Sequence, residues 1–178
     1  DSILTDAHID LAHLATDAGN IELAAQHLRA AESVARARGF SSDLARVLLL
    51  RAESCVRPEE AEIAASLCDE ALVLASGSDM QQGVWFIWFR ASRIYRRLGR
   101  IDDAVSCSWD MLHLSWDRRR VFEAERALLL LAELLLDLGR ASEAHIAVLT
   151  TEKLQPLTQG RGTQEIQELT RLIEAQID

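Results

Sequence analysis

Residues 128–144 read LLLLAELLLDLGRASEA, and residues 88–104 read WFRASRIYRRLGRIDDA, with small residues at matching places. The matching positions recur at intervals of 40 residues along the chain. They are Ala12, Ala52, Ser92 and Ala132 in one series, Ala24, Ala64, Ala104 and Ala144 in a second, and Gly19, Gly99 and Gly139 in a third, in which Glu59 replaces the glycine of the second copy. Two small residues in each copy indicate helix backbones that approach closely, and repeated helical hairpins of this kind stack into a solenoid. The period therefore predicts an all-α repeat protein.

Helical periodicity runs through the chain and predicts four hairpins followed by a last helix. The hairpins span about 3–38, 42–76, 80–117 and 120–156, with helices at 3–18 and 20–38, 42–56 and 59–76, 80–98 and 101–117, and 120–138 and 141–155. The three glycines fall where the first helix of a pair must turn, a position that favours a left-handed residue. Pro156 is predicted to end the last hairpin. The predicted domains are a repeat array over 1–158 and a terminal segment over 159–178.

The terminal segment is predicted to form a helix over about 163–177 with one apolar stripe. The stripe consists of Ile166, Leu169, Leu172, Ile173 and Ile177. It suits two roles, a cap over the open end of the array or the start of a coiled-coil connector to another domain.

The third copy resembles the tetratricopeptide repeat (TPR), whose characteristic positions hold a bulky aromatic, a second aromatic, a turn glycine and a small residue of the second helix. Those positions carry Trp88, Tyr95, Gly99 and Ala104. The fourth copy keeps the spacing with Leu128, Leu131, Ala132, Leu135, Gly139, Ala144 and Pro156. The resemblance covers about residues 5–156 and implies a right-handed solenoid that binds proteins or peptides. The 40-residue step is similar to the extended repeat variant of bacterial signalling and regulatory proteins, longer than the common repeat of about 34 residues.

Composition and motifs exclude several classes of function. The formal charge of −9 argues against direct nucleic-acid binding, which depends on clustered Lys and Arg. No apolar run approaches the roughly 18 residues of a membrane helix, so no membrane contact is expected. There is no phosphate-binding glycine loop, HExxH or GxSxG motif, and the histidines are scattered over different copies. We predict a non-enzyme without catalytic residues, cofactor or metal, and three cysteines without CxxC spacing favour a reducing, cytoplasmic location.

The candidate binding residues centre on the third copy, since eight of the nine aromatic residues lie between Trp85 and Phe122. Helical spacing places Phe86, Phe89, Arg93, Arg96 and Arg97 on one face of the first helix of this copy. The resemblance implies that this face lines the concave groove of the solenoid. The predicted groove contacts are Phe86, Phe89, Arg90, Arg93, Arg97, Arg57, Arg126, Leu49 and Glu53. Apolar rings beside guanidinium groups suit a protein segment that carries apolar and anionic groups.

Other interpretations of the same residues stay open. Arg90, Arg93 and Arg97 suit a purely structural role, paired with carboxylates such as Glu53, Glu133 and Asp137 on adjacent helices. Trp109 and Trp116 lie on one face of the next helix, where they suit either packing under the following copy or a homodimer contact. Because the chain begins at Asp1, a further alternative is a ligand-sensing regulatory domain of a larger bacterial signalling protein, a transcription regulator or a nucleotide cyclase.

Overall fold

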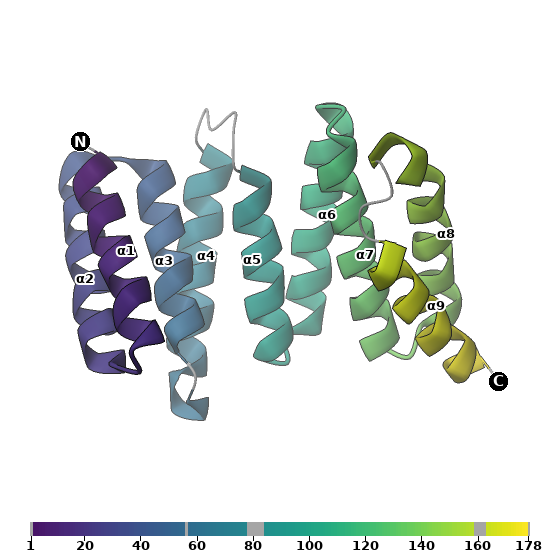
Figure 1. Cartoon of the computed structure of the whole chain (residues 1–178), viewed down its shortest axis with the longest axis horizontal. Coiled ribbons are helices and arrows are strands. Elements are labelled where there is room, and N and C mark those ends of the chain that lie inside the picture. Colours follow the sequence, from purple (N-terminus) through teal and green to yellow (C-terminus); the bar gives the residue numbers. More distant parts are fainter. Residues whose placement is uncertain (1, 56, 78–83, 159–162, 178) are drawn as a thin grey trace. The chain divides into compact units, whose positions relative to one another are not determined.

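The computed structural model of this chain describes residues 2–55, 57–77, 84–158 and 163–177. Over these residues its regular structure is α-helical, with one short 3-10 turn, η1 (Pro58–Glu60), in agreement with the predicted fold class (Figure 1). The chain divides into two compact units, Asp1–Ile94 and Tyr95–Asp178. No helix in the described ranges is long and apolar enough to span a membrane.

Unit 1 consists of two helical hairpins and the greater part of a fifth helix. Its helices are α1 (Ser2–Asp17), α2 (Ile21–Arg38), α3 (Ser41–Ser54), α4 (Ala61–Gly77) and α5 (Val84–Arg97), of which Tyr95 and later residues belong to unit 2. α1 packs against α2, α3 packs against α4, and α2 also contacts α3. The first helices α1 and α3 lie side by side in one layer, with α2 and α4 behind them (Figure 1). Ile9, Leu28, Val47 and Leu50 form an apolar core where the first hairpin meets α3.

Unit 2 continues the same pattern and ends with a single helix. Its helices are α6 (Ile101–Asp117), α7 (Val121–Asp137), α8 (Ala141–Thr158) and α9 (Thr163–Ile177). α7 contacts α6, α8 and α9, and α9 also packs against α8. The predicted apolar stripe of α9 contributes Ile166, Leu169 and Ile173 to the core of this unit. In unit 1, we use the name first-helix layer for α1, α3 and the residues of α5 up to Ile94. In unit 2, the same name refers to α7, α9 and the residues of α5 from Tyr95 onward.

The small residues of the repeat are buried at every position of both series. They are Ala12, Ala52, Ser92 and Ala132 on the first helices, and Ala24, Ala64, Ala104 and Ala144 on the second helices. In the structure, the 40-residue period thus marks buried positions on the helices. A larger side chain at such a place would push the helices apart or force its neighbours out of their rotamers.

The turns between the helices of the first, third and fourth hairpins contain a glycine in the left-handed conformation, as predicted. Gly19, Gly99 and Gly139 have φ angles of 75°, 74° and 70°. The turn between α2 and α3 has Gly39 at 69°, whereas the equivalent turn between α6 and α7 has Arg119 at 54°. Arg119 therefore carries a Cβ atom in a conformation that L-residues other than glycine adopt at a cost.

Several predicted helix ends differ from the structure. Pro156 does not end the last hairpin, because α8 continues to Thr158 and contains the proline. Pro156 lies in the last turn of α8, where it removes one backbone hydrogen bond, to the Glu152 carbonyl, close to the helix end. α3 ends at Ser54 rather than at 56, and η1 precedes α4. The predicted start of the third hairpin at 80–83 and the first residues of the predicted terminal segment, 159–162, lie outside the described residues.

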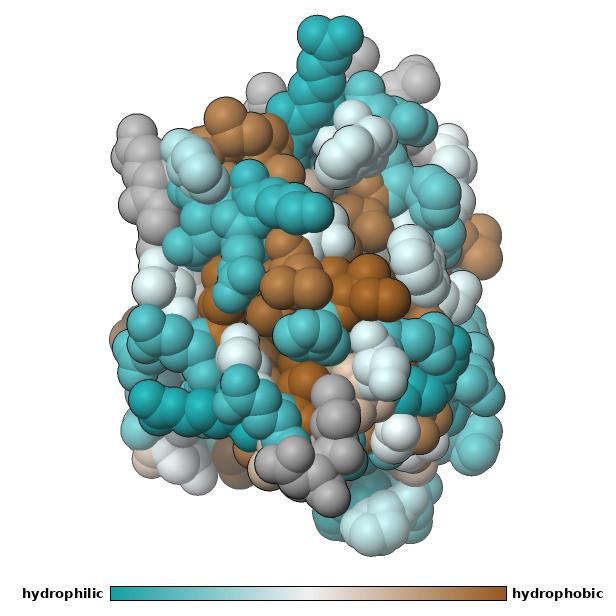
Figure 2. All heavy atoms as spheres, turned by 90° about the vertical axis from the view of Figure 1, so that its right-hand side faces the viewer, coloured by the Kyte–Doolittle hydropathy of each residue, from teal (hydrophilic) through white to brown (hydrophobic). Residues whose placement is uncertain are grey.

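The face of unit 2 formed by α8 and α9 combines polar and apolar side chains. Figure 2 shows apolar side chains gathered in the middle of this face, between polar groups. The exposed large apolar residues of the two helices are Ile146, Leu149, Leu157 and Leu172. α9 thus covers the apolar core beneath it and still presents apolar surface of its own.

We expect Arg119→Gly to raise the free energy of unfolding by about 1 kcal/mol, because glycine has no Cβ atom to strain the left-handed turn. Gly139→Ala should lower it by a similar amount, since its φ of 70° disfavours alanine. Gly77→Ala is the matched control, because Gly77 is helical with open space around its Cα. Urea unfolding monitored by circular dichroism measures all three, and a destabilising Arg119→Gly would contradict the prediction.

Candidate functional site

Ion pairs join successive first helices in both units. In unit 1, Arg46 of α3 pairs with Asp6 of α1, and Nη1 of Arg90 on α5 lies 2.9 Å from Oε2 of Glu53 on α3. In unit 2, Arg96 of α5 pairs with two carboxylates of α7. Further along, Nη1 of Arg126 on α7 lies 2.6 Å from Oε2 of Glu165 on α9. Arg90 and Arg126, two of the predicted groove contacts, therefore join neighbouring first helices. This agrees with the alternative interpretation that such arginines have a structural role.

Two arginines of α5 lie over phenylalanine rings one turn apart. The Arg90 guanidinium is 4.6 Å from the centre of the Phe86 ring, and that of Arg93 is 5.8 Å from the centre of the Phe89 ring. Both rings are half-buried, and Trp85 contacts each of them. Stacking of this kind holds a guanidinium in place while leaving its N–H groups able to donate hydrogen bonds.

The two stacked arginines differ in their remaining partners. Arg90 is half-buried and donates to Glu53, so the charge of its guanidinium is compensated. Arg93 is exposed, and no carboxylate in the described ranges pairs with it. Phe89 and Arg93 thus present an apolar ring and a held cation at the surface of unit 1.

The other predicted contacts lie in different surroundings. Leu49 is 0% exposed in the core of unit 1, so its prediction as a groove contact is wrong in this structure. Arg57 pairs with Glu60 within the turn at η1, where the hydrogen bond to Glu60 raises the pKa of the guanidinium. Arg97 is exposed in the last turn of α5, within unit 2.

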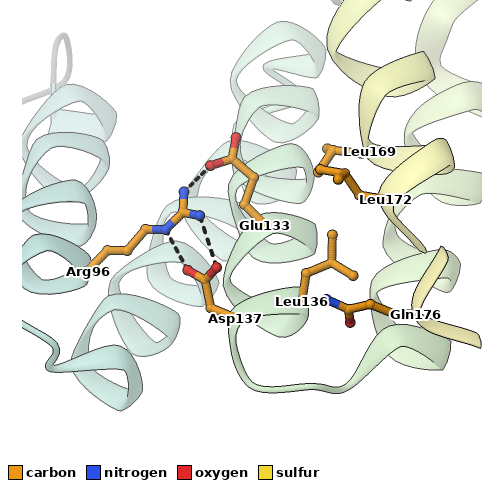
Figure 3. Close-up of a pocket in the computed structure, with 7 residues that line it drawn as sticks. All are labelled: Arg96, Glu133, Leu136, Asp137, Leu169, Leu172 and Gln176. Atoms are coloured by element: carbon orange, nitrogen blue, oxygen red, sulfur yellow. Dashed lines mark hydrogen bonds and ion pairs between the residues drawn. The ribbon is translucent and has the colours of Figure 1, made fainter. Parts of the chain in front are cut away.

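Unit 2 contains a cavity of about 380 Å³ between α5, α7 and α9. It is lined by Arg96, Glu133, Leu136, Asp137, Leu169, Leu172 and Gln176. Figure 3 shows Arg96 reaching from α5 to the carboxylates of α7 on one side, with the leucines of α9 on the other. The predicted groove contacts do not include any of the seven, although the i, i+4 spacing of Glu133 and Asp137 is visible in the sequence.

The polar wall of this cavity is a network around one guanidinium. Nε and Nη2 of Arg96 donate to the two oxygens of Asp137 at 2.6 and 3.1 Å, and Nη1 donates to Glu133. The hydrogen bond to Asp137 is the main cause that raises the pKa of Arg96 above its ordinary value, so the group stays charged. The sequence suggests Arg90, Arg93 or Arg97 as the partner of such carboxylates, whereas in the structure Arg96 pairs with both Glu133 and Asp137.

Two histidines come together that the sequence keeps 19 residues apart. Nδ1 of His8 on α1 lies 3.2 Å from Nδ1 of His27 on α2, within hydrogen-bond distance. No group of three or more His, Cys, Asp or Glu side chains in the described ranges is placed to hold a metal ion. The pair is therefore interpreted as a contact inside the first hairpin.

Comparison with known proteins identifies the fold. No protein-family model matches the chain, and no curated protein sequence matches it. Two similar solved structures are crystal structures of a Podosopora anserina putative kinesin light chain with nearly identical TPR-like repeats, one of them a variant. Each is 15% identical and covers 96% of this chain and 93% of its own, with TM-scores of 0.72 and 0.71. The chain thus has a TPR-like helical repeat fold.

Arg96→Gln should lower the free energy of unfolding by about 1 kcal/mol, because it leaves two neighbouring carboxylates without a counter-charge. Arg126→Gln is the matched control and should cost less, since the carboxylate of Glu165 with which Arg126 pairs is half-exposed. Urea unfolding at low salt and at about 1 M NaCl tests this, because salt should reduce the difference between the variants. Equal losses that do not depend on salt would contradict the assignment.

Proposed function

We propose that this chain is a non-catalytic module that binds a segment of a partner protein on the first-helix layer of unit 1. The segment carries an apolar side chain next to an acidic one, and Phe89 and Arg93 are the central contacts. The observation that supports this most directly is the exposed guanidinium of Arg93, held over the Phe89 ring without a carboxylate partner in the described residues.

The chemistry of the two side chains fits such a segment. A guanidinium offers paired N–H donors that match a carboxylate. Because Arg93 is already stacked on a ring, less side-chain freedom is lost when a ligand binds. The half-buried ring of Phe89 supplies apolar contact beside the charge.

The Arg90–Phe86 pair, one turn earlier on α5, explains why we propose Arg93 rather than Arg90 as the contact for an acidic side chain. Arg90 is stacked on Phe86 in the same way but donates to Glu53. An anionic ligand at Arg90 would have to displace or approach that carboxylate. Phe86, Arg90 and Glu53 are therefore assigned a supporting role that fixes α5 against α3.

A random peptide library displayed on phage tests the proposal even though the partner protein is unidentified. Selection on the full chain should enrich peptides with Asp or Glu beside an aliphatic or aromatic residue. Arg93→Glu should weaken binding of these peptides at least about tenfold, because attraction becomes repulsion at the contact. The matched control is Arg29→Glu, an exposed arginine of α2 outside the first-helix layer.

Melting curves and helix content should be the same for both charge reversals. If the selected peptides bind Arg93→Glu as tightly as the unchanged chain, the contact has been assigned to the wrong residue. Loss of binding in both variants would instead indicate a response to net charge alone.

Self-association is a second candidate function, favoured by two tryptophans at the surface of α6. Trp109 is 48% exposed and Trp116 is 64% exposed, and tryptophan is enriched at protein interfaces.

If this surface joins two copies, light scattering over a concentration series should show a mass that rises toward twice that of one chain. The double variant Trp109→Ser, Trp116→Ser should then stay monomeric, because it removes the apolar contact area. A monomeric unchanged chain at every concentration would exclude this function.

A further inference from the structure

The cavity of unit 2 holds more negative than positive charge. Arg96 brings one positive charge, whereas Glu133 and Asp137 bring two negative charges. Both oxygens of Asp137 accept hydrogen bonds from Arg96. Glu133 accepts through Oε2, and its Oε1 has no hydrogen-bond partner among the described residues. Since the Glu133 side chain is 40% exposed, a carboxylate oxygen is available at the mouth of the cavity.

The opposite wall of the cavity is apolar. Leu136 and Leu169 belong to the core of unit 2 and show only small parts of their surface. Leu172 is 52% exposed, although it lines the same cavity. Gln176 lies at the edge next to Leu136 (Figure 3), and its amide makes no hydrogen bond to the rest of the described chain. An amide in this position can donate to and accept from a peptide backbone.

We propose that this cavity is a binding site for an extended segment of a partner protein with a Lys or Arg next to an aliphatic residue. The aliphatic side chain lies against Leu136, Leu169 and Leu172, and the cation meets the open oxygen of Glu133. A volume of 380 Å³ falls within the range of about 300–1,000 Å³ that is usual for ligand pockets.

Charge decides between a basic and an acidic occupant. An acidic group would find Arg96 already engaged and two carboxylates beside it, so repulsion would oppose its binding. A basic group meets the excess carboxylate without breaking the network around Arg96. This site goes beyond the proposed function, because it lies wholly within unit 2 and selects the opposite charge.

Three blocked heptapeptides test the site directly. They have the sequence Gly-Ser-Leu-X-Leu-Ser-Gly with Lys, Gln or Glu at X, and each is titrated to millimolar concentration into the full chain. Methyl NMR signals of Leu136, Leu169 and Leu172 report binding. We expect the Lys peptide to shift these signals and to bind about three- to fivefold more tightly than the Gln peptide, the effect of one half-exposed charge pair. The Glu peptide should cause no shift.

Two charge-neutralising variants show which carboxylate causes the preference for the Lys peptide. Glu133→Gln should reduce binding of the Lys peptide to that of the Gln peptide. Glu143→Gln is the matched control, because Glu143 is exposed on α8, pairs with Arg140 and does not line the cavity. Leu172→Ser, a change at an exposed position, should weaken the Lys and Gln peptides alike by removing the apolar wall.

The site is overturned if the Lys and Glu peptides shift the leucine signals equally, or if neither shifts them. It is also overturned if Glu133→Gln leaves the preference for Lys unchanged while its spectrum remains that of the folded chain. Arg93→Glu should not alter the Lys-peptide titration. The failure of this inference is therefore distinguishable from the failure of the proposed function.

Discussion

Close approach of helix backbones at the small residues is the constraint on which the rest of the structure depends. Alanine or serine occupies two places in each hairpin, and all eight side chains are buried. Because these contacts recur every 40 residues, they fix how each hairpin lies on the next within a unit. Side chains about one repeat apart on the first helices then meet. The ion pairs of Asp6 with Arg46 and of Glu165 with Arg126 span 40 and 39 residues for this reason.

The same 40-residue spacing determines which charged side chains pair with a neighbouring helix and which are exposed to solvent. Arg90 and Arg93 are one turn apart on α5, and both lie over phenylalanine rings. Only Arg90 meets a described carboxylate, because Glu53 of α3 lies opposite it. In unit 2, Arg96 pairs with two carboxylates, so the net charge of these three side chains is negative. The contacts within each unit thus leave Arg93 of unit 1 without a described carboxylate partner and the Arg96 cluster of unit 2 with an excess of carboxylate.

Sequence reasoning grouped Phe86, Phe89, Arg93, Arg96 and Arg97 on one face of α5 but did not identify the partner of each residue. Leu49 lies in an unbroken apolar run, residues 47–50, which has no periodicity to show which side chain is buried. The long arginine side chains can reach several carboxylates, so spacing alone did not single out Arg96 as the partner of Glu133 and Asp137. The cavity also needs α9, whose position against α7 is a tertiary contact.

The sequence by itself determined the helical repeat fold, the glycine turns at Gly19, Gly99 and Gly139 and the burial of the small residues. These features depend on local periodicity, on glycine at positive φ and on small side chains, all of which are visible in a single chain. The tertiary structure alone decided which charges are compensated, that Leu49 is buried, and that Leu172 of α9 shares a cavity with Arg96 of α5. Those outcomes depend on distances between side chains of different helices, which are set only when the helices pack.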